Sequence, residues 1–266
     1  MSRIITLTTD FGTSDGFAGA MKGVILSLCP DAKIVDITHD VPPQDVLSGA
    51  LALEAAAPTF PPNTIHVVVV DPGVGSERAA LYLETRKHFF VGPDNGIFDL
   101  VSAGRFVRAM KLSQTELLNP APSATFHGRD IFAPVAAHLA NGTPIDHFAE
   151  PVTSLVRLML PQPERKGADL EAHILHADRF GNLITDLKRF EYDDWNRENA
   201  AVELVIGGRR IEGISRTYAD VKDGNMVAYF GSGNRLEIAV RNNSAQVLFQ
   251  WSLAQARRQS VLLKKV

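Results

Sequence analysis

The strongest constraint on the fold of this chain is an apolar run at residues 65–70, which reads Ile-His-Val-Val-Val-Val. Successive side chains of a β-strand point to opposite faces of its sheet, so four consecutive valines make both faces apolar. A strand of this kind is stable where both faces of the sheet are covered, as in helix-flanked sheets. The run therefore predicts a central strand in a layered α/β domain.

Strand-like and helix-like patterns alternate on both sides of this run. We expect strands at residues 4–9, 33–38, 80–84 and 88–91, and helices at residues 16–28, 45–57 and 129–139. The strand patterns are rich in β-branched residues, and the helical patterns repeat apolar residues every three or four positions. The alternation predicts an α/β domain with a largely parallel sheet over residues 1–160.

The composition changes at residues 161–168, which hold two prolines, one glycine and three charged residues. Such a stretch is typical of a linker between domains. Short strand-like runs follow it without intervening long helical patterns. We therefore expect a smaller all-β domain over residues 169–266.

Composition excludes several classes of function. The chain has 27 Lys and Arg against 30 Asp and Glu, a net charge of -3, which does not favour nucleic-acid binding. The single cysteine, Cys29, excludes an intramolecular disulfide and a multi-cysteine zinc site. No apolar run approaches the roughly 18 residues of a membrane helix, and the N-terminus does not resemble a signal peptide. We expect a cytoplasmic protein that binds neither membranes nor nucleic acids.

Polar clusters follow the predicted strands, where ligands bind in open α/β sheets. The first cluster holds Asp10, which leaves the strand at residues 4–9, and Asp15, which lies near the start of the next helix. A carboxylate at this place can accept two hydrogen bonds from a ribose diol. For Asp15, capping of the helix is an equally good interpretation.

Two further clusters supply candidates for catalysis. Asp71 ends the valine strand, and Arg78 follows seven residues later across a loop with two glycines. These two side chains could form either a structural ion pair or part of a catalytic site. His127 stands in a strand-to-helix loop beside a glycine and two charged residues, a setting that favours function. By contrast, residues 92–96 carry an Asn-Gly turn signal, and we interpret them as structural.

The second domain offers side chains suited to a nucleobase. Asn182 and Asn243 could pair with an adenine edge, and Phe180 and Tyr218 could stack on a purine. A turn at residues 178–182 and a β core are the structural alternatives. The residues alone leave both interpretations open.

Taken together, six motifs resemble those of the S-adenosyl-L-methionine (SAM) hydroxide adenosyltransferase family, the adenosine-forming SAM hydrolases related to the fluorinase and chlorinase halogenases. The motifs occur in the family's order and lie at residues 8–15, 71–78, 92–96, 126–130, 178–182 and 236–239. The resemblance covers nearly the whole chain. It implies an α/β N-terminal domain, a β-barrel-like C-terminal domain, and a homotrimer with its ligand held between neighbouring subunits.

The resemblance also implies roles for individual residues. The hydrolases carry an Asp-Arg-His triad, which corresponds to Asp71, Arg78 and His127 and argues for water as the nucleophile. Asp10 would hold the ribose hydroxyls. Asp15 and Ser232 would meet the methionine ammonium and carboxylate. The residues expected on the adenine side are Phe180, Asn182, Tyr218, Arg241 and Asn243.

The chemistry implied is the displacement of methionine from C5′ of the ribose by an activated water. It requires neither a metal nor a cofactor, since SAM itself is the substrate. Three alternatives remain open from the sequence. They are a SAM-dependent halogenase, a calcium-dependent nucleoside N-ribohydrolase, whose aspartate cluster Asp10 and Asp15 resemble superficially, and a non-catalytic adenosine-binding protein.

Overall fold

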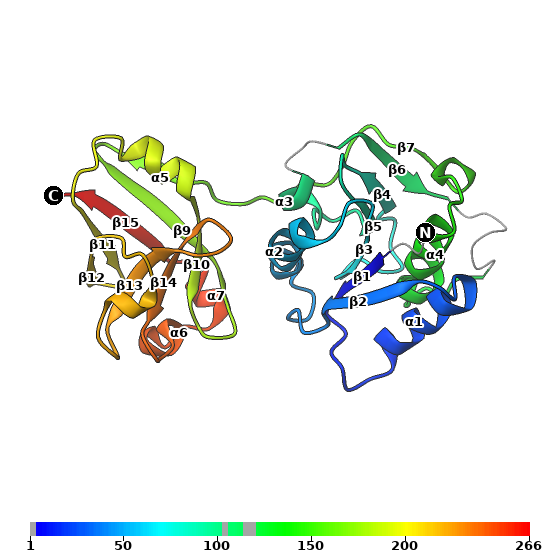
Figure 1. Ribbon diagram of the computed structural model, residues 1–266, viewed down its shortest axis with the longest axis horizontal. Helices are drawn as coiled ribbons and strands as arrows, with labels where there is room; N and C mark the ends of the chain where they lie inside the picture. The colour runs from blue at the N-terminus through cyan, green and yellow to red at the C-terminus, as the bar shows by residue number, and fades with distance from the viewer. Residues whose placement is uncertain (1–3, 103–105, 114–120) are drawn as a thin grey trace. The chain divides into compact units, whose positions relative to one another are not determined.

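The structure, a computed structural model, describes residues 4–102, 106–113 and 121–266 (Figure 1). The chain divides into two compact units, Met1–Leu158 and Met159–Val266. Each unit has its own core, and each is described here by itself.

Unit 1 is built on one mixed sheet with the strand order β2-β1-β3-β5-β4-β6-β7. The strands are β1 (Ile4–Thr9), β2 (Lys33–Thr38), β3 (Ile65–Val69), β4 (Ala80–Glu84), β5 (Phe89–Pro93), β6 (Arg108–Leu112) and β7 (Ala149–Pro151). The neighbours β2, β1, β3 and β5 pair in parallel, and β4, β6 and β7 add antiparallel pairs. Every residue of β3 is buried, which confirms the prediction of a central strand covered on both faces.

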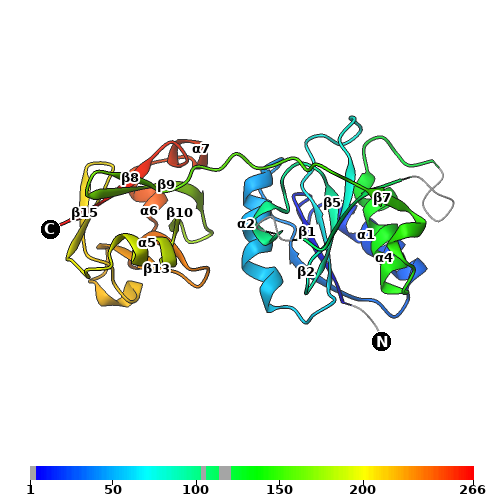
Figure 2. The same cartoon turned by 90° about the horizontal axis from the view of Figure 1, so that it is seen from above.

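Helices cover both faces of this sheet (Figure 2). On one face, α1 (Phe17–Leu28) and α4 (Ala133–Ala140) pack in a core that includes Met21 and Phe132. On the other, α2 (Val46–Ala56) and α3 (Asp99–Ser102) pack in a second core that includes Leu53. The side chain of Asp45 caps α2 by accepting a hydrogen bond from the amide of Ser48.

The helix expected at residues 129–139 is interrupted near its start. Residues Gly128–Phe132 form a π-helical turn (η2), and α4 begins after it. Pro134 stands in the first turn of α4, where its missing N–H leaves no helical hydrogen bond unmade. The wider turn directly follows His127 and so lies next to a predicted site residue.

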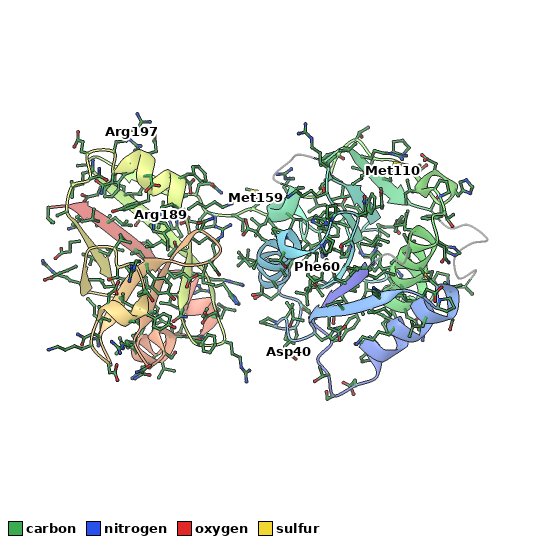
Figure 3. The ribbon with its side chains drawn as sticks, viewed as in Figure 1. Asp40, Phe60, Met110, Met159, Arg189 and Arg197 are labelled. Atoms are coloured by element: carbon green, nitrogen blue, oxygen red, sulfur yellow. The ribbon has the colours of Figure 1, made fainter. Side chains whose placement is uncertain are left out.

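A cluster of rings is carried by β3, by β5 and by the segments directly before these strands. His66 stacks on Phe90 with ring centroids 5.2 Å apart, and His88 meets His66 edge-on at 4.9 Å. Phe60, labelled in Figure 3, packs edge-on against His66 from the segment before β3. Burial lowers the pKa of His66 to about 3, so this imidazole is neutral at physiological pH.

Unit 2 is an antiparallel, nearly closed sheet with the strand order β12-β11-β15-β9-β10-β14-β13, and β8 pairs with β9. Its strands are β8 (Glu164–Lys166), β9 (Asp169–Ala177), β10 (Leu183–Lys188), β11 (Val202–Ile206), β12 (Arg209–Glu212), β13 (Met226–Phe230), β14 (Arg235–Val240) and β15 (Ser260–Lys265). The short helices are α5 (Arg189–Trp195), α6 (Ala245–Phe249) and α7 (Leu253–Ala256). The expected fold class, α/β followed by barrel-like all-β, is confirmed. Strand β8 lies within the segment that we expected to be a linker.

Within the described ranges, no helix combines the length and the apolar character that a membrane crossing would require.

Candidate active site

Three of the predicted motifs meet at one end of the sheet in unit 1. Asp10 follows β1 and Asp71 follows β3, and these parallel neighbours bring both carboxylates to the same edge. A cavity of about 330 Å³ opens there. Its lining consists of Asp10, Phe11, Phe17, Pro43, Gln44, Val69, Asp71, Val74, Thr125, Phe126, His127 and Gly128. The carboxyl ends of parallel strands thus form a hollow, as expected for an α/β fold.

Asp71 and Arg78 form a buried ion pair beside this cavity. Nε of Arg78 lies 3.0 Å from each carboxylate oxygen of Asp71, and Nη2 lies 2.5 Å from Oδ2. The two side chains are only 3% and 10% exposed, respectively. Charge-assisted contacts of this kind fix both groups in position. The contact foreseen from the sequence therefore exists, and it stands at a cavity.

Arg78 also connects this pair to His127, which is 49 residues further along the chain. Its Nη2 lies 2.6 Å from Nδ1 of the imidazole. A guanidinium offers only N–H donors and does not deprotonate, so Nδ1 accepts the hydrogen bond. In the neutral ring the proton is then on Nε2. Arg78 thus selects the tautomer of His127.

Electrostatics keep His127 neutral. Burial lowers the pKa of its imidazole, and the positive charge of Arg78 lowers it further, against the opposing influence of Asp71. Protonation would place an N–H at Nδ1 directly against a guanidinium N–H. The arrangement seen here is therefore the one that holds above the lowered pKa.

Backbone contacts explain why loops distant in sequence converge. Gly75 has φ +78°, and a Cβ there would lie 2.5 Å from the carbonyl oxygen of Ala124, so only glycine lets the two loops approach. On the second loop, Asp130 accepts a hydrogen bond from the amide of Ser123 at 2.8 Å. The approach of Gly75 to Ala124 thus brings the loop of Arg78 against the loop of His127, and the bond of Asp130 orders the second loop internally.

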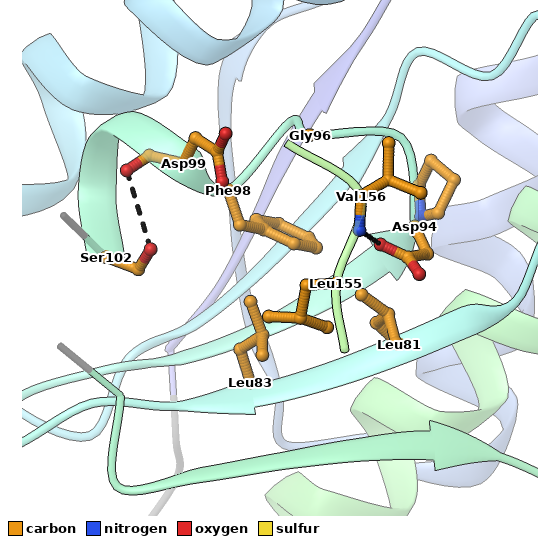
Figure 4. A pocket seen from close by; sticks show the side chains of 10 residues that line it. Leu81, Leu83, Asp94, Gly96, Phe98, Asp99, Ser102, Leu155 and Val156 are labelled. Carbon is orange, nitrogen blue, oxygen red and sulfur yellow. Dashed lines mark hydrogen bonds between the residues drawn. The ribbon is translucent and has the colours of Figure 1, made fainter. Parts of the chain in front are cut away.

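The turn at residues 92–96 contacts the backbone directly before Asp71. The side-chain amide of Asn95 donates to the carbonyl of Val70, directly before Asp71, at 2.8 Å. Asp94 accepts from the amide of Val156 at 2.9 Å beside a small cavity of about 10 Å³ (Figure 4). Burial raises the pKa of Asp94. These contacts are those of a structural turn, and the role of this motif stays a prediction.

Asp10 and Asp15 differ in their surroundings. Asp10 lines the cavity, and its Oδ2 accepts a hydrogen bond from the backbone amide of Gln44 at 2.7 Å. Asp15 is exposed and is not among the residues that line the cavity. The N-cap of α1 is Gly16, and no side chain caps this helix, so the structural alternative for Asp15 is not observed.

A second cavity, of about 410 Å³, lies in unit 2. All five residues expected on the adenine side line it, and its full lining is Phe180, Asn182, Tyr218, Tyr229, Ala239, Val240, Arg241, Asn242 and Asn243. Phe180 is 77% exposed and Tyr218 is 57% exposed. Large aromatic rings left exposed beside amide groups are suited to a flat heteroaromatic ligand.

A tight turn presents the first part of this lining. Asp178 accepts hydrogen bonds from the amides of Phe180 and Asn182 at 2.9 Å, and its second oxygen accepts from the Asn182 side chain. Gly181 has φ +80° and packs against Ser244, where a Cβ would collide with the hydroxyl. The turn alternative raised by the sequence is therefore correct, and the same turn displays Phe180 and Asn182 at the cavity.

Arg241 lines the second cavity but its guanidinium bonds to the protein itself, and Ser232 lies outside both cavities. The guanidinium of Arg241 donates to the carbonyls of Ala219 and Val221 and pairs with Asp223 at 2.8 Å. It thereby holds the segment that carries Tyr218. Ser232 is exposed in the turn between β13 and β14, and it lines neither cavity.

Several lining residues were not singled out from the sequence. Phe11, Phe126 and Gly128 stand inside the quoted motifs, so their positions beside Asp10 and His127 were a usable signal. Gln44 and Tyr229 carried no such signal, because only tertiary contacts bring them to the cavities. Among the described residues, no group of three or more His, Cys, Asp or Glu side chains is placed to hold a metal ion. The carboxylate cluster that a calcium site needs is thus not formed in this part of the chain.

Comparison with known proteins identifies the family. Residues 5–149 match the SAM hydroxide adenosyltransferase N-terminal domain, and residues 172–257 match the C-terminal domain of the same family. This chain belongs to the SAM hydroxide adenosyltransferase family. The resemblance drawn from the six motifs is therefore confirmed.

Proteins named as SAM hydrolases and, more distantly, as fluorinases align with most of this chain. A Methanocaldococcus jannaschii protein named (R)-S-adenosyl-L-methionine hydrolase is 36% identical, over 92% of this chain and 91% of that protein. A Thermus thermophilus protein of the same name is 39% identical, over 92% and 94%. A fluorinase from an Actinoplanes species is more distant, at 26% identity over 94% of each chain.

A solved structure also has the same fold. It is titled an uncharacterized conserved protein from Thermotoga maritima and is 31% identical, with a TM-score of 0.88. The match covers 98% of this chain and 100% of that chain.

Proposed function

We propose that this protein hydrolyses SAM to adenosine and L-methionine. The observation that carries the proposal is the buried Asp71–Arg78–His127 network at the edge of a cavity. The family membership and the relatives named as SAM hydrolases support it.

The reaction is an in-line displacement at C5′ of the ribose. The oxygen of a water molecule forms a bond to C5′ while the bond from C5′ to the sulfonium sulfur breaks. The electron pair of that bond goes to sulfur, so methionine leaves as a neutral thioether. One proton of the water has to be removed, and the protein supplies its acceptor and the position of the water.

The geometry favours Asp71 as the proton acceptor. His127 accepts from Arg78 at Nδ1 and carries its proton at Nε2, so it can donate a hydrogen bond to the water but has no free lone pair. Arg78 has only donors, so it cannot accept the proton, and its hydrogen bonds fix Asp71 and His127 in position. A carboxylate is a weak base toward free water. The attacking oxygen, however, becomes strongly acidic as the C–O bond forms, so a late transfer to Asp71 suffices.

The remaining residues take the substrate-binding roles implied by the family. Asp10 holds the ribose hydroxyls, and Asp15 and Ser232 face the methionine ammonium and carboxylate. The adenine-side residues are Phe180, Asn182, Tyr218, Arg241 and Asn243. The proposal includes a cytoplasmic homotrimer whose sites combine neighbouring subunits, with no metal and no cofactor.

Incubation of the pure protein with SAM in ¹⁸O-labelled water tests the reaction. We expect adenosine that carries the label at the 5′ oxygen, together with methionine, and equal rates with and without a chelator. A 5′-halogenated nucleoside formed in the presence of chloride or fluoride would instead identify a halogenase. Binding of adenosine without turnover of SAM would identify a nucleoside-binding protein. Light scattering on a sizing column measures the trimer separately.

A further inference from the structure

Three phenylalanine rings form one wall of the cavity in unit 1. Phe11 follows β1, Phe17 opens α1, and Phe126 directly precedes His127. Their centroids are 5.8 Å apart for Phe11 and Phe17, 5.8 Å for Phe11 and Phe126, and 5.3 Å for Phe17 and Phe126. All three line the cavity. We call these three residues the aromatic wall.

The aromatic wall stands at the edge of the hydrophobic core, because Phe11 and Phe126 are half-buried and pack against it while Phe17 is not part of it. Phe17 is 48% exposed, whereas Phe90 and Phe132 of the same unit are 2% and 0% exposed. Its rings meet at steep angles, with interplanar angles of 55°, 79° and 90°, so they do not stack on one another and cover one another's faces only in part. Apolar surface kept exposed beside a cavity is characteristic of a binding surface.

The charges around the aromatic wall favour a cation. Asp71 and Arg78 neutralise each other and His127 is neutral, so the carboxylate of Asp10 leaves the lining with a net negative charge. One member of the wall already binds a cation, since the guanidinium of Arg129 lies 5.0 Å from the ring centroid of Phe126. That guanidinium is itself paired with Asp130. The cavity thus combines negative charge with aromatic faces.

A sulfonium is the cation that fits such a wall. It bears three carbon substituents and no N–H donors, so it cannot satisfy carboxylates through hydrogen bonds and is weakly hydrated. Aromatic faces bind cations of this kind, as they do quaternary ammonium groups, through the negative potential of the ring. Hydrogen-bonding cations such as ammonium would gain less from phenylalanine than from a carboxylate.

We propose that Phe11, Phe17 and Phe126 form the receptor for the sulfonium group and make this protein select charged SAM over neutral thioether nucleosides. This inference rests on the proposed function and adds the basis of its substrate selection. Because the positive charge disappears as the C5′–S bond breaks, the wall binds the charged substrate more tightly than the neutral thioether product. It therefore strengthens substrate binding rather than the chemical step.

Phe17→Leu is the sharpest test, since it keeps an apolar side chain at an exposed helix start and removes the ring. We expect KM for SAM to rise about 2- to 30-fold, the range given by a cation–π contact, and kcat to stay equal or rise, because the positive charge is being lost in the transition state. The inhibition constant of S-adenosylhomocysteine, the neutral thioether analogue, should stay the same. Phe17→Trp should lower KM for SAM. Phe190→Leu, which removes an aromatic residue 67% exposed on α5 and outside both cavities, is the matched control.

Two results would overturn the inference. An equal rise in the constants for SAM and S-adenosylhomocysteine would show that the ring makes only apolar contact, and no change in either would show that it does not touch the ligand. A wild-type protein that fails to convert SAM would contradict the proposed function instead. Calorimetric titration of the same variants with SAM and S-adenosylhomocysteine would still decide the question of selectivity.

Discussion

The two cavities of this protein are built in opposite ways. In unit 1 the charged groups are bonded to one another, and the side chains of Asp71 and Arg78 are almost completely buried. In unit 2 the aromatic rings of Phe180 and Tyr218 project from turns and are mostly exposed. Buried charges have to be paired, so Asp71, Arg78 and His127 are held by one another in the first cavity, whereas the second offers aromatic surface that a ligand would cover.

This difference suggests a division of labour. A network with fixed hydrogen-bond directions can position a water and move a proton, which is what the chemical step needs. Exposed rings and amides supply affinity and specificity for a flat base but no proton chemistry. Changes in the Asp71–Arg78–His127 network of the first cavity should therefore alter kcat, and changes in the second cavity should alter KM.

Asp71→Asn should have the largest effect. The amide keeps the shape of the carboxylate but cannot accept the proton, so kcat should fall by about 10²- to 10⁴-fold while SAM still binds. Single-turnover kinetics with calorimetry of SAM binding measure both quantities. Asp31→Asn, at an exposed aspartate after α1, is the control. Normal turnover by Asp71→Asn would refute the assignment of the triad.

Acid should distinguish the two units next. His66 has a pKa of about 3 in the folded state, so the unfolded chain binds more protons below pH 6.5, and stability is lost as pH falls from 6.5 toward 3. Burial raises the pKa of Asp186 and Glu237 in unit 2 and of Asp94 in unit 1, and these groups favour folding as pH falls, so the large shift of His66 is what distinguishes unit 1. Unit 1 should therefore unfold first on acidification, as followed by hydrogen exchange.

His88→Phe isolates this acid response. No described residue hydrogen-bonds either ring nitrogen of His88, and burial lowers the pKa of its imidazole. A phenyl ring removes two unsatisfied polar atoms, so we expect a gain of about 1–3 kcal/mol at pH 5 and a weaker pH dependence of the melting temperature. A loss of stability at pH 5 would show that the imidazole is needed there.

Asn182→Ala and Phe180→Leu test the second cavity. Loss of an amide pair or of a stacking face should raise KM for SAM by about tenfold and leave kcat within a factor of two. Steady-state kinetics with SAM measure the split. Arg179→Ala, in the same turn but outside the lining, serves as the control. A fall in kcat with unchanged KM would contradict the hypothesis that the second cavity contributes only to substrate binding.

The pH profile should show the smallest change near neutrality. Neutral His127 is the active form, and its pKa lies below the ordinary value, so kcat should vary by less than about threefold between pH 8 and 6.5. It should decline at lower pH, as protonation breaks the contact with Arg78. In His127→Gln the side-chain amide does not titrate in this range, so the fall of kcat at low pH that protonation of His127 causes should be absent. If kcat of this variant falls with pH as in the wild type, another group is responsible for the fall.

The local pattern of the sequence predicted much of the fold. The valine run marked β3, and the motifs placed Asp10, Asp71 and His127 after strands or before a helix, which sets their common edge. The turn at residues 178–182, which the sequence left open beside a functional interpretation, is present. These features depend on residues near one another in the chain, where periodicity and turn chemistry operate.

Other features depended on contacts across the chain. Gln44 reaches Asp10 from a different loop, and the π-helical turn after His127 interrupts a segment that the pattern extends as one helix. Ser232 lies in the exposed turn before β14 and lines neither cavity. No local rule predicts these placements, since each follows from how distant loops pack.

The sequence by itself determined the family, the fold classes of the α/β and all-β domains, and the residue types available for chemistry. Only the tertiary structure decided that Arg78 joins Asp71 to His127, which tautomer the imidazole adopts, and that three phenylalanines share one cavity. The reason is physical. Side-chain alternation and turn preferences are properties of neighbouring residues, whereas a hydrogen-bond direction or a ring-to-ring distance exists only after loops 49 residues apart have closed on each other.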